Sequence, residues 1–335
     1  MKTKIVFIER KFWQFVSIEK VFRQIKKNLS KEDFDTSFRQ MPFGNNLTGI
    51  IKNLLFFRRP EADIYHITGH IHYIALVLPK RKTVLTVHDL GFMKNQKGFR
   101  RYVLKKLFLD LPLKRAGYVT AVSESTKREI SFYTGFKSDK IRVIENPLRY
   151  NFTTSQKKSF QSRLPRILQV GSGANKNIIN LVKALRGVTC RLVIIGKLEE
   201  KIIASLEENK IQFENKFGIS DLEIKSEYQK ADIVVFCSTF EGFGLPLIEA
   251  QAMRTPVVTS NISPLREISG GAAQLVEPCD FMSIRKGILK VINDEEYRQN
   301  LIESGIENVK RFDARRVAAE YEDLYREVIK ANLKN

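Results

Sequence analysis

The sequence is poor in the residues that hold disulfide-linked and zinc-bound folds together. Its 335 residues include only three cysteines, Cys190, Cys237 and Cys279. No two of them are closely spaced, and Cys190 and Cys237 lie in apolar runs typical of buried strands. An odd set of thiols argues against a disulfide framework or a zinc knuckle and is typical of a reducing cytoplasm. We therefore expect no disulfide and no structural metal.

Long hydrophobic runs are also missing. No stretch approaches the roughly 18 apolar residues of a transmembrane helix. The first residues, MKTKIVFIER, hold a short apolar run before Glu9 and Arg10, well below the about 7–15 residues of a signal peptide's apolar region. We expect a cytoplasmic protein whose contact with a membrane is peripheral.

Acidic residues are scarce in one half only. The chain has 57 Lys and Arg against 37 Asp and Glu, a formal net charge of +20. Residues 1–165 contain 33 basic and 13 acidic residues, whereas residues 166–335 contain 24 of each. This surplus indicates a polyanionic partner for the first half: an anionic membrane surface, a phosphorylated lipid or a nucleic acid. A lysine-rich surface that only confers solubility is the simpler alternative.

Short apolar runs alternate with helix-like segments along the whole chain. We expect buried strands at 5–8, 64–67, 84–87, 118–122, 167–170, 192–195, 233–237 and 257–259. We expect helices at 98–111, 123–133, 178–185, 198–208, 221–229, 247–253 and 282–293, and through most of the tail 294–330. This order predicts an α/β fold in which helices cover parallel sheets.

A polar stretch over residues 151–165 interrupts this alternation and predicts a linker. We expect a Rossmann-like domain over 1–150, a second over 166–312, and a C-terminal helix over 313–335. The apolar periodicity of residues 13–25 predicts a helix with basic neighbours, whose apolar side would contact a membrane or, as we expect for most of these residues, face the core.

The strongest local signal lies in residues 238–261. A glycine-rich loop with Gly242 and Gly244 follows an expected strand, and Pro246 stands where the next helix would begin. Bare backbone N–H groups and the positive end of a helix make an anion site suited to a diphosphate. Glu241 and Glu249 flank the loop and suit hydroxyl groups of a sugar or ribose. The alternative is a helix-dipole role for Glu249 and a plain surface position for Glu241.

Glu241 and Glu249, with seven residues between them and the sequence GFGLP after the first, resemble the E-x7-E motif of retaining glycosyltransferases of family 4. The resemblance implies a GT-B fold, in which two Rossmann-like domains face each other across a cleft. It also implies that the C-terminal helix, residues 313–335, packs back on the first domain. It implies that Glu241 contacts the donor sugar and that Glu249 binds the ribose. The backbone of Phe243, Gly244 and Leu245 would then meet the sugar and the diphosphate.

A second segment, LQVGSGANKN over residues 168–177, also resembles that family. The resemblance assigns Gly171, Ser172 and Gly173 to donor binding and gives Lys176 the role of compensating the diphosphate charge. Ser172 stands where many relatives carry an arginine, which places more of this role on Lys176. A dinucleotide G-x-G-x-x-G motif fails here because Lys176 replaces the third glycine.

In the first half, TVHDL over residues 86–90 resembles the family's strand-end His-Asp. The resemblance makes His88 a candidate contact for the donor sugar, against the alternative of a satisfied strand-end histidine. Thr68, Gly69, His70 and Asp89 are candidates for the acceptor side. His70 and His72 would place two rings on one strand face, but no carboxylate or cysteine completes a zinc site.

The resemblance implies an enzyme that moves a hexosyl unit, with retention, from a UDP- or GDP-linked sugar to a saccharide or lipid-linked saccharide, without a cofactor or metal. Synthesis of a cell-surface polysaccharide or lipopolysaccharide at the inner face of the cytoplasmic membrane would suit the charge. Candidates for contacting an anionic membrane are Arg23, Lys26, Lys27, Arg100, Arg101, Lys105, Lys106, Lys114 and Arg115. The alternatives are a non-catalytic relative that binds a nucleotide sugar, or a basic nucleic-acid-binding protein, for which no recognition motif is present.

Overall fold

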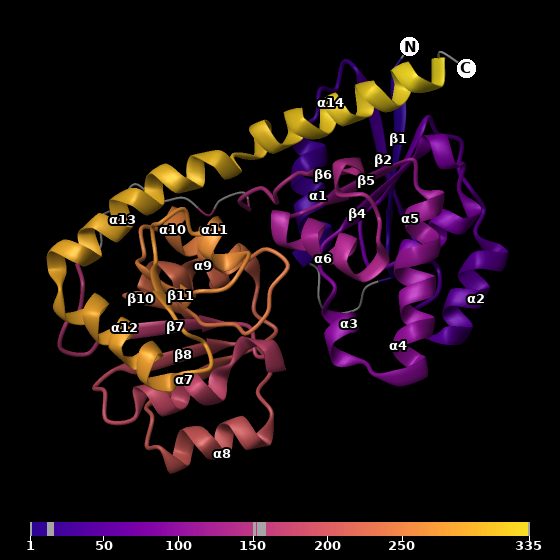
Figure 1. Cartoon of the computed structure of the whole chain (residues 1–335). Helices are drawn as coiled ribbons and strands as arrows, with labels where there is room; N and C mark the ends of the chain where they lie inside the picture. The colour runs from indigo at the N-terminus through magenta and orange to yellow at the C-terminus, as the bar shows by residue number, and fades with distance from the viewer. Residues whose placement is uncertain (1, 12–16, 150–151, 153–158, 334–335) are drawn as a thin grey trace. The chain divides into compact units, whose positions relative to one another are not determined.

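The computed structural model describes residues 2–11, 17–149, 152 and 159–333. The chain divides into two compact units (Figure 1). The first unit contains residues 1–149 and 312–335, and the second contains residues 150–311. The tail is therefore shared: the helix α13 (Glu295–Val309) lies in the second unit, and the helix α14 (Ala314–Leu333) belongs to the first.

The first unit is built on a sheet of parallel strands in the order β2-β1-β3-β4-β5-β6. The strands are β1 (Thr3–Glu9), β2 (Phe34–Gln40), β3 (Ile64–Ile67), β4 (Thr83–Val87), β5 (Tyr118–Ala121) and β6 (Ile141–Val143). The strand order reverses between β1 and β3. In open α/β sheets, ligands bind beyond the carboxyl ends of the strands at such a reversal.

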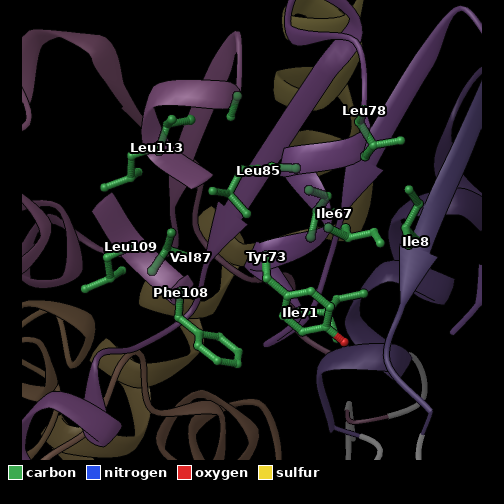
Figure 2. Close-up of a cluster of buried hydrophobic side chains, with 14 of the residues drawn as sticks. Ile8, Ile67, Ile71, Tyr73, Leu78, Leu85, Val87, Phe108, Leu109 and Leu113 are labelled. Carbon is green, nitrogen blue, oxygen red and sulfur yellow. The ribbon is translucent and has the colours of Figure 1, made fainter. Parts of the chain in front are cut away.

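Helices cover both faces of this sheet. They are α1 (Ser17–Asn28), α2 (Leu47–Phe56), η1 (His72–Val77), α3 (Gly91–Asn95), α4 (Gly98–Lys105), a π-turn (Lys106–Asp110), α5 (Leu111–Arg115), α6 (Glu124–Thr134) and α14. Ile8, Ile67 and Leu85 point to one face and pack with Tyr73 and Phe108 in a single core (Figure 2). The α1 and α14 helices pack side by side and cover the other face.

The second unit has parallel strands in the order β12-β11-β10-β7-β8-β9. They are β7 (Arg166–Val170), β8 (Arg191–Ile195), β9 (Phe213–Lys216), β10 (Ile233–Phe236), β11 (Val257–Ser260) and β12 (Gln274–Val276). The helices are α7 (Ile178–Leu185), α8 (Glu200–Glu208), α9 (Asp221–Lys230), α10 (Leu245–Ala252), α11 (Leu265–Ile268), α12 (Phe281–Asn293) and α13. The strand order reverses between β7 and β10, which is the doubly wound arrangement of dinucleotide-binding folds.

The α/β fold and all eight expected strands are confirmed, but β2, β6, β9 and β12 were not expected. All four lie at sheet edges. An edge strand is partly open to water and carries polar residues, so it leaves no continuous apolar run. The sequence FENK of β9, in which no residue is fully buried, is an example.

Part of the expected linker lies outside the described residues, at 151 and 153–158. Of the rest, Phe152 packs edge-on against Tyr228 with ring centroids 5.5 Å apart, and Phe160 lies under the Arg298 guanidinium at 3.8 Å. These residues pack on the second unit. The expected helix over 13–25 begins at Ser17 among the described residues, and it buries Val21, Phe22 and Ile25 in the core as predicted.

A buried hydrogen-bond network fixes α14 to the first sheet. His66 on β3 bonds through Nδ1 to the Tyr325 hydroxyl and through Nε2 to Thr86 Oγ1, each at 2.7 Å. Thr86 in turn bonds Thr120 Oγ1 at 2.6 Å. Because every member is paired, this network specifies how the terminal helix docks.

Three fully buried histidines predict acid sensitivity of the first unit. Burial lowers the pKa of His66 and of His88 to about 3, and that of His72 to about 4. The unfolded chain takes up these protons near pH 6.5, so the free energy of unfolding should fall as the pH drops from about 6.5 to 4, by about 1.4 kcal/mol per pH unit for each histidine. His72→Phe should reduce that slope by about one third, measured by urea unfolding between pH 7 and 5. A slope equal to that of the wild type would contradict the assignment.

Candidate active site

Two loops of the second unit meet at the reversal of strand order. One covers residues 171–177 after β7, and the other covers residues 237–244 after β10. Because β7 and β10 are parallel neighbours, both loops leave the same edge of the sheet. The two segments singled out in the sequence are thereby brought together.

Lys176 and Glu241 form an ion pair between these loops, from the Lys176 ammonium to Glu241 Oε1. Asn175 Nδ2 donates to the same oxygen at 3.2 Å and to the Phe240 carbonyl at 2.9 Å. The Lys176 ammonium also lies 4.6 Å from the ring centroid of Phe236. Both charged side chains are largely shielded, with 18% and 13% of their surface exposed. The pair thus places one cation and one carboxylate between the two loops.

The glycines in the first loop make room for this lysine. Gly171 has φ of +90°, and a Cβ there would lie 2.8 Å from Lys176 Cε. Ser172 donates its hydroxyl to the Lys197 carbonyl at 2.7 Å, so its side chain ties the loop to the end of β8. Gly173 is exposed at the loop tip. Ser172 therefore provides no cation, and Lys176 is the positive group that this loop contributes.

The second loop ends at the N-terminus of α10. Gly244 is the N-cap with φ of +118°, and a Cβ there would lie 2.6 Å from Leu265 Cδ2. Pro246 stands in the first turn, where its missing N–H is harmless. Phe243 is buried and Leu245 is half-buried. The N–H groups of the first turn and the helix dipole therefore make this helix end suitable for an anion.

Glu249 lies on the inner face of α10 and has no exposed surface. The Tyr228 hydroxyl, from α9, donates to Glu249 Oε2 at 2.8 Å. A ribose hydroxyl that donates a hydrogen bond to the Glu249 carboxylate would therefore have to approach it beside Tyr228. No local sequence signal pointed to Tyr228, because it lies 21 positions from Glu249 and on a different helix.

The candidates in the first unit lie at the ends of the neighbouring strands β3 and β4. Thr68 bonds back to β1, since its N–H and its Oγ1 both donate to the Ile8 carbonyl, at 3.0 and 3.1 Å. His88 Nε2 bonds the Thr68 carbonyl at 3.0 Å. A carbonyl only accepts, so Nε2 carries the proton and Nδ1 remains an acceptor. With a pKa of about 3, His88 is neutral at pH 7.

His70 and Asp89 form a second polar pair there, with His70 Nε2 3.4 Å from Asp89 Oδ2. Asp89 Oδ1 also accepts the Gly91 N–H at 2.8 Å. Burial raises the pKa of the Asp89 carboxyl, but the bond to His70, its charge and the Gly91 N–H outweigh burial and hold that pKa below its ordinary range. Thr68, Gly69, His70, His88 and Asp89 are thus brought together at one sheet edge.

No group of three or more potential metal ligands occurs among the described residues. His70 and His72 do not lie on a strand, as the H-x-H pattern suggested, because β3 ends at Ile67 and His72 begins η1. His72 instead donates from Nδ1 to the Phe108 carbonyl at 2.7 Å.

Two family models match the chain in succession. The model described as Glycosyltransferase Family 4 matches residues 29–150, and the one described as Glycosyl transferases group 1 matches residues 151–308. The chain belongs to this glycosyltransferase family. It is therefore an enzyme, and the alternative of a nucleic-acid-binding protein is set aside.

Relatives and solved structures agree with this assignment. The glycosyltransferase is 26% identical to the capsular polysaccharide biosynthesis glycosyltransferase CapM of Staphylococcus aureus, over 87% of this chain and 84% of CapM. It is 30% identical to the O-antigen chain mannosyltransferase RfbU of Salmonella typhimurium, over 63% of this chain and 61% of RfbU. The crystal structure of Anabaena HepE in complex with UDP and glucose matches with a TM-score of 0.78 and 15% identity, over 97% of this chain and all of that one. The fold is of the GT-B class.

Proposed function

We propose that this hexosyltransferase takes its sugar from a nucleotide-diphosphate donor bound in the second unit and transfers it with retention of configuration. The observation that carries the proposal is the Lys176–Glu241 pair, held between two glycine-rich loops at the reversal of strand order. A diphosphate would lie between the Lys176 ammonium and the N-terminus of α10, with Glu241 beside the sugar.

The chemistry follows from where charge develops. As the bond from the sugar to the diphosphate breaks, negative charge grows on the departing oxygen, and Lys176 with the loop N–H groups stabilises it. The departing phosphate then accepts the proton of the attacking acceptor hydroxyl on the same face of the sugar. Glu241 is engaged by Lys176 and Asn175, so we assign it to orienting the sugar rather than to nucleophilic attack. Neutral His88 would accept a hydrogen bond from a sugar hydroxyl through Nδ1, because its Nε2 donates to the Thr68 carbonyl.

The relatives indicate the substrate classes. RfbU is an O-antigen chain mannosyltransferase, CapM belongs to capsular polysaccharide biosynthesis, and the HepE structure contains UDP and glucose. We propose a UDP- or GDP-linked hexose as donor and a saccharide or lipid-linked saccharide as acceptor, in the synthesis of a cell-surface polysaccharide. No helix among the described residues is long and apolar enough to cross a membrane. The basic first unit is proposed to place the enzyme at the cytoplasmic face of an anionic membrane.

Thermal unfolding with UDP, GDP, UDP-glucose and GDP-mannose tests the donor. The matching nucleotide should raise the melting temperature by mass action, with about 2.7 kcal/mol of added stability at a hundred times its Kd. Transfer should continue in the presence of a chelator, since Lys176 supplies the positive charge, and NMR of the product should show a retained anomeric configuration. Binding without transfer or hydrolysis would favour a non-catalytic relative. An inverted product would contradict the proposed mechanism.

A further inference from the structure

The helix α2 carries apolar side chains on its outward face. Leu47, Ile51 and Leu55 are 68%, 48% and 71% exposed, and their spacing of four residues places them in one stripe. Phe56, at the end of the helix, is 64% exposed. The opposite side of the same helix packs in the core through Ile50 and Leu54. A helix at a water-facing surface normally has a polar outer face, so this stripe requires an explanation.

The helix α4 repeats the pattern. Phe99, Tyr102 and Val103 are exposed, and the rings of Phe99 and Tyr102 stack with centroids 6.4 Å apart. Its inner side packs through Leu104 on the same core that holds Ile50 of α2. Both helices therefore pack on the same hydrophobic core of the first unit. We call the outward side chains Leu47, Ile51, Leu55, Phe56, Phe99, Tyr102 and Val103 the α2–α4 surface.

The surroundings of this surface are strongly basic. Residues 42–117 contain 14 Lys and Arg against four Asp and Glu. One of the four, Asp110, is paired with Lys105 and Lys106, at 2.7 and 3.2 Å. The exposed cations on and around the two helices include Lys52, Arg58, Arg59, Lys97, Arg100, Lys114 and Arg115.

We propose that the α2–α4 surface docks on a bilayer that contains anionic phospholipid, with its apolar side chains inserted at the boundary of headgroups and acyl chains. Exposed aromatic and aliphatic side chains with basic neighbours are the pattern of an interfacial helix. The surrounding cations are attracted by anionic headgroups. This inference rests on the proposed function in one respect only: docking would bring the acceptor side of the enzyme to a lipid-linked substrate.

Co-sedimentation of the full chain with vesicles tests the proposal. Vesicles of phosphatidylcholine and phosphatidylglycerol should bind the wild type, and pure phosphatidylcholine should bind it much less. The variant Leu55→Ser/Phe56→Ser should bind at least about tenfold more weakly, because two large apolar side chains no longer leave water. The matched control is Phe217→Ser in the second unit, whose side chain is also 64% exposed and which should bind like the wild type.

A charge variant separates attraction from insertion. Arg58→Glu/Arg59→Glu should weaken binding, with its largest effect at low salt. Leu55→Trp in a Trp13→Phe background should shift its emission to shorter wavelength when vesicles are added, whereas Phe217→Trp in the same background should not. Wild-type binding by Leu55→Ser/Phe56→Ser, or no shift at Leu55→Trp, would overturn the proposal.

Two further measurements distinguish lipid docking from a protein interface, and the docking surface from the proposed function. Light scattering should show the same mass for the wild type and for Leu55→Ser/Phe56→Ser, whereas a wild-type oligomer dissolved by those substitutions would make the surface a protein interface and overturn lipid docking. The nucleotide-induced rise in melting temperature should be unchanged in this variant. Vesicle binding without any nucleotide effect would reject the proposed function alone, and the reverse result would reject only the docking surface.

Discussion

Replacing Lys176 by alanine is expected to lower the turnover number about 10²–10³-fold, with a smaller effect on the Michaelis constant for the donor. Losing one preorganised group that stabilises charge in a transition state has this size of effect. The Lys176 ammonium is largely shielded and is the cation that the first loop supplies, since Ser172 uses its hydroxyl within the loop. Its stabilisation grows as the diphosphate departs, so the loss falls mainly on turnover.

The control for Lys176→Ala is Lys183→Ala, which removes an exposed lysine of α7 and should leave transfer unchanged. Glu241→Gln should also lower turnover, because it removes the carboxylate partner of Lys176 and Asn175. Steady-state kinetics of both variants is measured with the nucleotide sugar that stabilises the protein in the thermal unfolding test. Turnover of Lys176→Ala close to that of Lys183→Ala would show that the lysine has no role in the chemical step.

Replacing Gly244 by alanine should destabilise the second unit by about 2–6 kcal/mol and abolish donor binding. Alanine rarely adopts the φ of +118° found there, and the added Cβ would lie 2.6 Å from Leu265. Backbone strain and overpacking each cost about 1–3 kcal/mol. Relief of that strain would move the start of α10, where the proposed diphosphate site lies. Urea unfolding and nucleotide titration measure the two effects.

Gly187→Ala is the matched control for Gly244→Ala. Gly187 also has positive φ, +72°, but nothing lies within 4 Å of a Cβ placed there. The Gly187→Ala substitution should cost only about 1–2 kcal/mol of backbone strain and leave donor binding intact. If both alanine variants lost the same stability and both bound donor, the close packing of Gly244 would have no functional importance.

The sequence predicted the central strands and the two glycine-rich loops because both leave local signals. Continuous apolar runs mark strands buried on both faces, and the glycines with Glu241 and Glu249 mark the loop. The edge strands left no such signal. Neither did the partners that position the site: Tyr228 reaches Glu249 from another helix, and Asn175 reaches Glu241 across 66 residues. Such contacts depend on the three-dimensional arrangement of the strands.

His66 illustrates the same limit. The sequence placed it on a buried strand, but its partner Tyr325 comes 259 residues later. Tyr325 on α14 and Thr86 on β4 each pair one ring nitrogen of His66, which explains why a polar ring is tolerated in that core. The exposed stripe of α2 escaped sequence analysis for a related reason. Leu47, Ile51 and Leu55 are as apolar as the core residue Ile50, and only the packed structure separates the two sides of the helix.

The docking of α14 also sets an order of events during synthesis. The second unit is one continuous segment, whereas the first unit needs α14 to cover His66 and Thr86. While the ribosome is still making residues 314–333, the emerging N-terminal sheet has one face without its final helix. The unit whose residues are made first is therefore finished last, and a chaperone that shields this face would be useful until residues 314–333 have emerged.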